Sequence, residues 1–449
     1  MYITLNILHY ETIWFFLLLE SQGVTQEKIL DISYETGLIK RKRMIMPEDL
    51  LFAICNGTIQ GDSSYNDLAM RIDYTTENRV SKQAVAKKIK QQCKVFMQEV
   101  VKIILEKKLE KSKYIEVLKT LKYKRIIVQD STIIKLPLAL YEVFSGVTNR
   151  YSKRTNARIQ VVYDLLSEQF INFSIDTYTK NDSKSAPELQ IKEGDLVLRD
   201  RGYLSYDEVK RHIDAGADCI YRHKFNTNYW DVNTLNPIDL TKMLKKNGNL
   251  DMEVRLNNKE KTIVRIISSP VDKSVADERR RKAKKESSSK NPSKDYLEQL
   301  DWTIFIITIP KYMADFSTIL KLYSLRWRIE IIFKSWKSNM NFSKYHNVSA
   351  IQLYVIVLAR FIMAMLFVQF IFKKCKIMIY NHFKKHLSLM KTIKYLTNFP
   401  DALIGLSRDL INNDKKEIGL GIKKLKRYCC YDSRINRLNF EQEMMMILA

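Results

Sequence analysis

Apolar and polar residues follow a helical pattern over roughly the first 115 residues. Ser81 is a typical N-cap, and the basic segment 82–89 after it has the apolar spacing of an amphipathic helix. With the segment 65–72 before it, this helix could form a helix-turn-helix pair, although any helical bundle contains such pairs. Residues 1–115 are therefore predicted to be a helical N-terminal region.

After this region the chain changes to short apolar runs that are bounded by polar residues. Such runs are typical of strands, and they cover residues 125–129, 158–166, 170–177, 196–199 and 219–222. The polar residues 167–169 between the second and third runs predict a hairpin, and residues 206–215 predict a helix. The first run ends at Asp130 and the fourth at Asp200. Residues 120–224 are therefore predicted to form the first part of a mixed α/β sheet.

The pattern is less regular between residues 225 and 300. Short strand candidates at 252–256 and 262–267 are followed by a basic run, Arg279–Lys285. We interpret residues 225–300 as a β-rich insertion in the sheet region, with the basic run in an exposed loop.

The sheet pattern returns with a strand predicted at residues 302–309. From Phe316 onward the chain has the pattern of helices. Residues 301–345 are therefore predicted to complete the core, and residues 346–449 to form a helical C-terminal region.

Residues 351–372 are apolar over a length that could span a bilayer. Arg360 lies near the middle of this stretch, and a central arginine costs roughly 2.5–3.5 kcal/mol on insertion in a membrane. A helix that is buried on most sides in a large core explains the pattern better than a membrane span does.

The charge balance points to a polyanionic partner. The 449 residues include 75 Lys and Arg against 50 Asp and Glu, which gives a formal net charge of +25. Nucleic acid is the commonest partner for such a surplus, and the N-terminal helices and the basic run Arg279–Lys285 are candidate DNA-contacting segments. The alternative is that the lysines only solvate the surface.

Six cysteines are scattered along the chain without the paired spacing of a zinc site. A disulfide framework is not expected in a long chain with so few cysteines, so a reducing cytoplasm fits best. The apolar N-terminus carries no Lys or Arg before Lys28, so it lacks the basic region of a signal peptide.

The segment 323–337 carries the most specific pattern in the chain. At about 100° per residue, a helix would place Tyr323, Arg326, Glu330 and Lys337 within an arc of roughly 60°. Apolar residues fall on the opposite side: Leu325, Ile329, Ile332 and Trp336. The alternative is that Glu330 only forms helix salt bridges, with Arg326 and Lys334, which are worth a few tenths of a kcal/mol.

The cleavage or transfer of phosphodiester bonds would use the same residues as metal ligands and phosphate-binding cations. Two divalent ions roughly 4 Å apart need several carboxylates, and Asp130, Asp200 and Glu330 can supply them. Mg²⁺ prefers such oxygen ligands, while Arg326 and Lys337 could neutralise nearby phosphates. Each aspartate alone could equally be a turn residue at a strand end.

These residues resemble the signature of bacterial DDE transposases of insertion-sequence family 4. The Tyr-Arg-Glu-Lys spacing is the most specific element of the resemblance, which covers roughly residues 120–345. Asp130 in Gln-Asp-Ser-Thr and Asp200 in Arg-Asp-Arg-Gly-Tyr look like the first and second acidic motifs of that family. The long gap between Asp200 and Glu330 also resembles the family, whose ribonuclease H-like core is interrupted there by a β-rich insertion.

The resemblance implies cut-and-paste transposition that depends on two divalent ions, Mg²⁺ or Mn²⁺. Its partners would be the terminal inverted repeats and the target DNA, bound by a homodimer in a synaptic complex. By spacing, Arg222 and Lys224 stand where the family places DNA-contacting cations, and Trp302 stands where a base-stacking tryptophan occurs. For Trp302 the alternative is a strand residue in the core.

Three other functions remain open from the sequence alone. A ribonuclease H-like nuclease that cleaves without joining strands would use the same carboxylates. A catalytically inactive descendant would only bind DNA, although all three carboxylates are present. A membrane protein is opposed by Arg360 and by the charged residues elsewhere in the chain.

Overall fold

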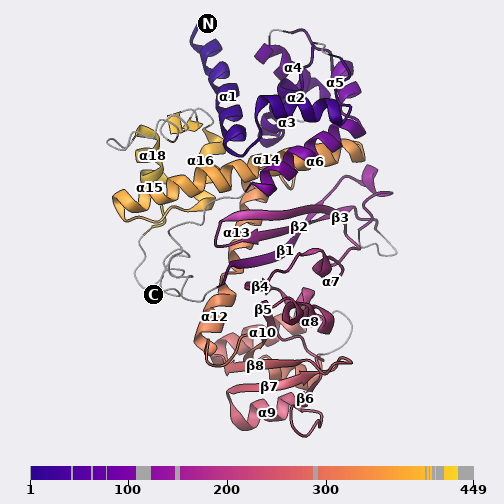
Figure 1. The fold of residues 1–449 in the computed structure, drawn as a ribbon, viewed down its shortest axis with the longest axis vertical. Coiled ribbons are helices and arrows are strands. Elements are labelled where there is room, and N and C mark those ends of the chain that lie inside the picture. The colour runs from indigo at the N-terminus through magenta and orange to yellow at the C-terminus, as the bar shows by residue number, and fades with distance from the viewer. Residues whose placement is uncertain are drawn as a thin grey trace.

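The computed structural model describes most of the chain, with side chains from Thr12 onward (Figure 1). The described residues are 2–41, 44–61, 64–76, 78–107, 123–146, 152–286, 292–399, 402–403, 405–406, 410 and 419–432. The predicted boundary between residues 115 and 120 therefore lies outside them. The N-terminal helices lie at one end of the molecule and the predicted insertion at the other, with the first part of the sheet between them (Figure 1).

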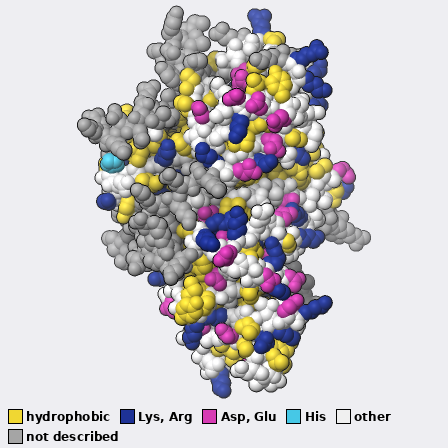
Figure 2. Space-filling model, in the orientation of Figure 1, with side chains coloured by type: hydrophobic (Ala, Val, Ile, Leu, Met, Phe, Trp, Pro, Cys, Tyr) yellow, Lys and Arg dark blue, Asp and Glu magenta, His cyan; other side chains and the backbone are white. Residues whose placement is uncertain are grey.

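The predicted N-terminal helical region is helical in the structure. Its helices are α1 (Tyr2–Ser21), α2 (Gln26–Glu35), α3 (Pro47–Gln60), α4 (Tyr65–Thr76), α5 (Lys82–Lys88) and α6 (Gln91–Glu106). Ser81 caps α5 as predicted, since its side chain accepts a hydrogen bond from the backbone N–H of Ala84. Helices α4 and α5 pack together, and Lys and Arg side chains gather at the corner where they lie (Figure 2).

Nine strands form a single mixed sheet in the order β3-β2-β1-β4-β5-β9-β8-β7-β6. The strands are β1 (Arg125–Lys135), β2 (Asn156–Asp164), β3 (Gln169–Thr177), β4 (Asp195–Arg199), β5 (Asp218–Arg222), β6 (Tyr229–Asp231), β7 (Leu250–Leu256), β8 (Ile263–Pro270) and β9 (Trp302–Ile307). The fold is therefore α/β, with the ribonuclease H-like core and helical flanks that the sequence predicted.

The predicted hairpin is confirmed, but β1 is longer than predicted. Strands β2 and β3 pair antiparallel, and Glu168 at their turn has a φ of 53°. Strand β1 does not end at Asp130, because Ser131–Lys135 continue to pair with β2. Thr132, Ile133 and Ile134 are β-branched, which favours this extension. Asp130 therefore lies in the middle of a strand.

The predicted insertion extends the same sheet rather than forming a separate one. Strand β9 pairs antiparallel with β5 on one side and with β8 on the other. Helices α9 (Leu240–Asn247) and α11 (Lys294–Gln299) also lie in the insertion, whereas α8 (Tyr206–Asp214) precedes it, between β4 and β5, where a helix was predicted.

The prediction that the basic run Arg279–Lys285 lies in a loop is wrong. These residues belong to helix α10 (Lys273–Glu286). Lys, Arg and Ala are good helix formers, and ion pairs one turn apart, such as Lys282 with Glu278, support the helix. Arg279 is tied to the sheet, since it donates to the backbone carbonyls of Leu300 and Trp302.

The segment 323–337 is also not one continuous helix. It is divided between α12 (Phe316–Ser324) and α13 (Trp327–Asn339). At the junction, the N–H groups of Leu325 and Arg326 bond to carbonyls three residues back, so the chain tightens into a turn. The predicted apolar side is nevertheless buried: Leu325, Ile329, Ile332 and Trp336.

The apolar stretch 351–372 is a buried helix, as predicted. It comprises α14 (Ala350–Met365) and a π-helical segment (Leu366–Phe372), and continues as α15 (Lys373–Phe383). The described residues contain one helix long and apolar enough to cross a membrane, residues 350–383, and its apolar part is entirely buried in the fold. Helix α14 packs against both α3 and α6.

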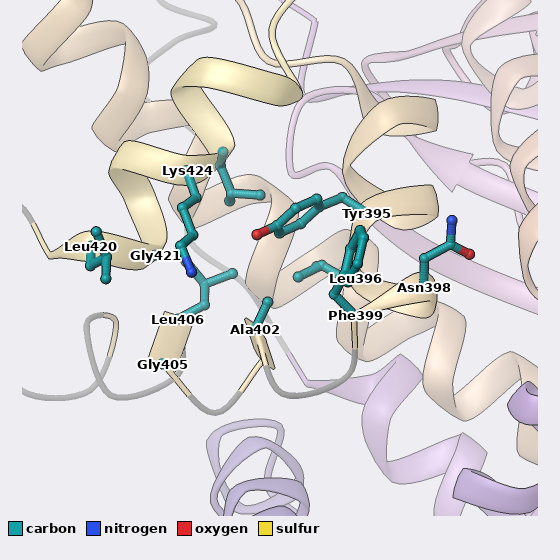
Figure 3. A pocket seen from close by; sticks show the side chains of 11 residues that line it. Tyr395, Leu396, Asn398, Phe399, Ala402, Gly405, Leu406, Leu420, Gly421 and Lys424 are labelled. Carbon is teal, nitrogen blue, oxygen red and sulfur yellow. The ribbon is translucent and has the colours of Figure 1, made fainter.

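The remaining described C-terminal helices are α16 (Leu389–Asn398) and α18 (Leu420–Tyr428). They line a mostly apolar pocket in which Tyr395 and Phe399 of the α16 segment face Leu420 and Lys424 of α18 (Figure 3). The rings of Tyr395 and Phe399 lie 5.3 Å apart. This pocket lies apart from the carboxylates that the sequence singled out.

Arg360 is buried in α14, where it binds backbone carbonyls rather than a carboxylate. Its guanidinium donates to the carbonyl oxygens of Thr58 (3.2 Å), Asn341 (2.6 Å) and Lys344 (3.1 Å). Arg360→Met would leave these acceptors buried without that donor, and each unsatisfied group costs about 1–3 kcal/mol. We expect the free energy of unfolding to fall by about 3 kcal/mol or more in urea denaturation.

The matched control for this prediction is Arg281→Met on the exposed side of α10. It should change the free energy of unfolding by less than about 0.5 kcal/mol, as surface substitutions usually do. Equal losses for the two variants would contradict the assignment of Arg360 as a structural residue.

Candidate active site

The pairing of β1 with β4 brings two acidic residues side by side. The strands are parallel, and their register ends with Gln129 opposite Arg199. The next residues are Asp130 and Asp200, so the two aspartates lie next to each other where β4 ends. Asp200 is half-buried and leads into a 3₁₀ turn, Arg201–Tyr203.

Glu330 reaches the same place from helix α13. It lies in the first turn of α13, and this helix packs against β1. The helix is held by its buried side, where Trp336 is fully buried and stacks on Phe342 with ring centroids 4.9 Å apart. Glu330 keeps 34% of its side chain exposed, so it remains accessible to a ligand.

Arg326 joins two of the three acids. Its Nη1 donates to Asp130 Oδ2 at 2.8 Å, and its Nη2 donates to Glu330 Oε1 at 2.6 Å. Only 8% of Arg326 is exposed, so these charge-assisted bonds lie in a partly desolvated setting. The three acids and the arginine predicted from the sequence are therefore brought together.

Burial and neighbouring charges shift the pKa of Asp130. Burial raises the pKa of Asp130 to about 7, the charge of Arg326 opposes this rise, and the nearby Glu330 and Asp200 add to it. Burial alone would lower the pKa of Arg326, but Tyr323, Asp130 and Glu330 together hold that pKa above its ordinary value. Arg326 is therefore fully charged.

Tyr323 lies in the core beside this cluster and not on an exposed polar stripe. It is 7% exposed, and its ring contacts Phe305 with centroids 5.0 Å apart. Burial raises the pKa of Tyr323 to about 12, with a smaller rise from Asp200 and opposing effects of Arg326 and Arg222. The turn between α12 and α13 explains this position, because it rotates Tyr323 away from the outer side of α13.

Asp200 also lines a cleft of about 310 Å³ between the core and the insertion. Two other predicted residues, Arg222 at the end of β5 and Trp302 at the start of β9, line the same cleft. Trp302 is half-buried, and its Nε1 donates to the carbonyl oxygen of Gly248 at 2.7 Å. Lys282 and Tyr296 add a further cation and a further aromatic ring to the lining, which also includes Glu286 and apolar residues.

Two predicted cations lie farther from the carboxylates. Lys224 is exposed in the loop after β5 and does not line the cleft. Lys337 lies seven residues after Glu330 on α13, which places it about 10 Å along the same side of the helix. Lys337 is half-buried, and this burial lowers its pKa.

Sequence pattern does not single out the buried polar networks near the two aspartates. Arg199 is fully buried in β4 and donates to Glu208, to Tyr221 and to the carbonyl oxygen of Ala186. An arginine inside an apolar strand, directly before an acid, is the only signal that the sequence offers for this network. A second network around Asp182 has no sequence signal beyond the Asn-Asp pair at a helix start.

The three carboxylates are suitable ligands for a divalent cation. Asp130, Asp200 and Glu330 offer the oxygen donors that Mg²⁺ prefers. As the side chains stand, no three His, Cys, Asp or Glu residues in the described part of the chain form a closed metal site. The guanidinium of Arg326 lies between two of the donors, so a cation there would replace its charge.

The cysteines take no part in this site. All six are buried and free of disulfide bonds: Cys55, Cys93, Cys219, Cys375, Cys429 and Cys430.

Comparison with known proteins identifies several similar chains. A transposase for insertion sequence element IS231F from Bacillus thuringiensis subsp. israelensis is 25% identical over 340 residues, covering 70% of this chain and 71% of that protein. A transposase for IS231D from B. thuringiensis subsp. finitimus is 26% identical, with 81% and 80% covered. A transposase for IS1151 from Clostridium perfringens is 25% identical, with 69% and 71% covered.

Among solved structures, the chain is similar to piggyBac transposase in a synaptic complex with hairpin DNA. The TM-score is 0.43 at 11% identity, covering 95% of this chain and 87% of that one. A likeness at this level adds nothing to the family assignment.

The family comparison is decisive. Residues 122–366 match the family described as "Transposase DDE domain", and this range includes Asp130, Asp200 and Glu330. Because the match spans more than half of the 449 residues, the chain belongs to the DDE-domain transposases, which cleave DNA and transfer strands.

Proposed function

We propose that this chain moves an insertion sequence by cut-and-paste transposition, with Asp130, Asp200 and Glu330 as its catalytic residues. The observation that supports this proposal is the convergence of the three acids, with Arg326 bonded to Asp130 and Glu330. The relatives, which are named as transposases for insertion sequence elements, support the substrate class.

In this proposal the three carboxylates hold two divalent ions, Mg²⁺ or Mn²⁺. When bound, such ions lower the pKa of a water molecule and stabilise charge on the leaving oxygen. Asp130 lies on β1, which is paired on both edges, and Asp200 lies beside it, while Glu330 approaches from α13. Three donors on three separate elements would fix the ions with little freedom.

The cations are proposed to bind the DNA backbone. Arg326 would exchange its carboxylate partners for a phosphate, which a guanidinium can bind through two hydrogen bonds. Lys337 and Lys224 would contact phosphates farther from the reacting bond. Tyr323 would support Arg326, whose Cζ lies over the tyrosine ring at 5.7 Å from the ring centroid. The net charge of +25 supports a DNA partner.

We also propose a division of labour along the chain. The helices of residues 1–115 would bind the terminal inverted repeats, and residues 120–224 and 301–345 would carry the catalysis. The insertion, residues 225–300, would cover the DNA with the Lys and Arg residues of α10. Two ends must meet before strand transfer, so a homodimer in a synaptic complex is part of the proposal.

The direct test uses purified protein, MgCl₂ or MnCl₂, and a DNA fragment that carries the element's own terminal repeats. We expect cleaved ends and strand-transfer products, both abolished by EDTA. Asp130→Ala, Asp200→Ala and Glu330→Ala should each lower cleavage at least about 100-fold, because loss of one charge-stabilising group typically costs about 3 kcal/mol.

The control for this test is Asp295→Ala, an exposed carboxylate on α11 that should leave cleavage unchanged. Metal-dependent products from any of the three alanine variants would contradict the assignment of that residue. Cleavage without strand transfer would instead favour a ribonuclease H-like nuclease.

The cleft beside Asp200 yields a second prediction. If Trp302 stacks an unpaired base, Trp302→Ala should weaken that step by about 1–3 kcal/mol, or roughly 5- to 150-fold, whereas Trp302→Phe keeps an aromatic face. The measurement is the fluorescence of 2-aminopurine placed beside the cleaved bond. An unchanged signal in Trp302→Ala would mean that Trp302 is only a sheet residue.

The raised pKa of Asp130 predicts a pH dependence of stability in metal-free buffer. The pKa is about 7 in the folded protein against an ordinary value of 3.8, so between these values the folded state binds more protons. The resulting stabilisation is complete below pH 3.8 and is lost as the pH rises to about 7.

Urea denaturation between pH 4 and pH 7, with EDTA present, measures this effect. Over this range the wild-type protein should lose on the order of 2–4 kcal/mol of unfolding free energy relative to Asp130→Asn, which cannot titrate. The variant Asp295→Asn should follow the wild type. Parallel curves for wild type and Asp130→Asn would show that Asp130 does not titrate in this range.

A further inference from the structure

Asp182 is the centre of a polar network that none of the proposed catalytic roles uses. It lies in the short helix α7 (Asp182–Ser185), between the hairpin and β4. Its Oδ1 accepts hydrogen bonds from Ser131 Oγ (2.7 Å), Arg158 Nη1 (2.9 Å) and Gln160 Nε2 (3.2 Å). Three donors on one carboxylate oxygen fix its position closely.

The network reaches Asp130 through the residue that follows it. Ser131 donates its hydroxyl to Asp182, and its backbone N–H donates to Asp130 Oδ1 at 2.8 Å. Side chains alternate along a strand, so Ser131 faces Asp182 while Asp130 faces Arg326 on the other side of β1. Asp182 therefore supports Asp130 from behind the strand and does not compete with it for a ligand.

The same network reaches Asp200 through the turn that follows it. A Cβ added at Gly202 would lie 3.1 Å from Asp182 Oδ2, so this turn packs directly on the second carboxylate oxygen. Tyr203, the next residue, is fully buried and donates its hydroxyl to Gln160 Oε1 at 2.7 Å. Gln160 thus connects the Asp200 turn to the same carboxylate that holds Ser131.

The charge of Asp182 is compensated within the network. Its partner Arg158 has 10% of its side chain exposed, and Asp182 has 26%. On β2, Gln160 lies opposite Ser131, so Arg158, Gln160 and Ser131 project from the same side of the sheet. The carboxylate of Asp182 therefore contacts side chains of both strands and lies against the Asp200 turn.

We propose that Asp182 is a positioning residue that sets the separation of Asp130 and Asp200 and thereby the affinity of the site for divalent cations. The proposal rests on the function proposed above for the two aspartates. Residues that orient metal ligands typically change metal affinity 10- to 100-fold when they are removed. The same geometry explains the glycine at position 202, because a side chain there would press on the carboxylate of Asp182.

The test is Mn²⁺ binding to the full-length protein without DNA, followed by the electron paramagnetic resonance signal of free Mn²⁺. We expect Asp182→Ala to bind Mn²⁺ at least about 10-fold more weakly than the wild type. Its binding to terminal-repeat DNA in EDTA should stay within about 2-fold, because the network lies behind the carboxylates. Cleavage should recover partly at high MnCl₂.

The matched control is Asp176→Ala. Asp176 is also a half-buried carboxylate with a lysine partner, Lys180 at 2.9 Å, but its described contacts include neither Ser131 nor the Asp200 turn. Both variants are expected to lower the melting temperature by a similar amount. Only Asp182→Ala should lose Mn²⁺ affinity, which separates positioning from general destabilisation.

A milder variant covers the case in which Asp182→Ala does not fold. Ser131→Ala removes only the hydroxyl that joins Asp182 to the Asp130 segment and should weaken Mn²⁺ binding by a smaller factor. Where both variants fold, combining them should add little to the effect of Asp182→Ala alone, since both break the same connection.

The outcomes distinguish this inference from the proposed function. Wild-type Mn²⁺ affinity in Ser131→Ala and Asp182→Ala, in a protein that binds Mn²⁺ and cleaves DNA, would overturn the role of Asp182 alone. A wild-type protein that neither binds Mn²⁺ nor cleaves would overturn both. Equal losses of affinity in Asp182→Ala and Asp176→Ala would also overturn the inference.

Discussion

The geometry of the candidate active site depends on the guanidinium of Arg326. It holds the carboxylates of Asp130 on β1 and Glu330 on α13 together in a partly buried position. Asp130 and Glu330 would repel each other and Asp200 in a setting of reduced polarity. Burial is the main cause of the raised pKa of Asp130, and the charges of Glu330 and Asp200 add to the rise. Arg326 offsets the repulsion by donating to both. The arrangement concentrates negative charge where a phosphodiester and its cations would have to meet.

Rigid elements on each side keep this charge in place. Strand β1 is paired on both edges, with β2 and β4. Strand β2 supplies Arg158 and Gln160, which bond to Asp182, and β4 carries the buried Arg199 directly before Asp200. Helix α13 is fixed from the other side. Arg360 joins the end of α3 to the loop after α13 through backbone carbonyls, so the N-terminal helices and the helix that bears Glu330 share one support.

The insertion extends the sheet and also lines the cleft next to Asp200. Because β9 pairs with β5, the chain returns from the insertion directly beside Arg222, and Trp302 enters the cleft that Asp200 lines. Helix α10 is attached to the same strand by Arg279, whereas Arg281, Lys282, Lys284 and Lys285 are exposed. On the face shown in Figure 2, Lys and Arg side chains are interspersed with Asp and Glu rather than forming one continuous patch.

The sequence by itself predicted most of the strands and helices and the candidate site residues. Short apolar runs identified the strands, and the spacing from Arg326 to Glu330 identified the helix that bears the third acid, because these features depend on neighbours in the chain. What only the tertiary structure decided concerns contacts between distant residues. The length of β1 depends on its pairing with β2, and the burial of Tyr323 depends on a turn that packs against Phe305. The helical state of α10 follows from local features, namely good helix formers and ion pairs one turn apart, and only its attachment to Leu300 and Trp302 depends on the fold. Asp182 could not be found from the sequence, because its importance lies in three donors from two strands that meet only in the folded sheet.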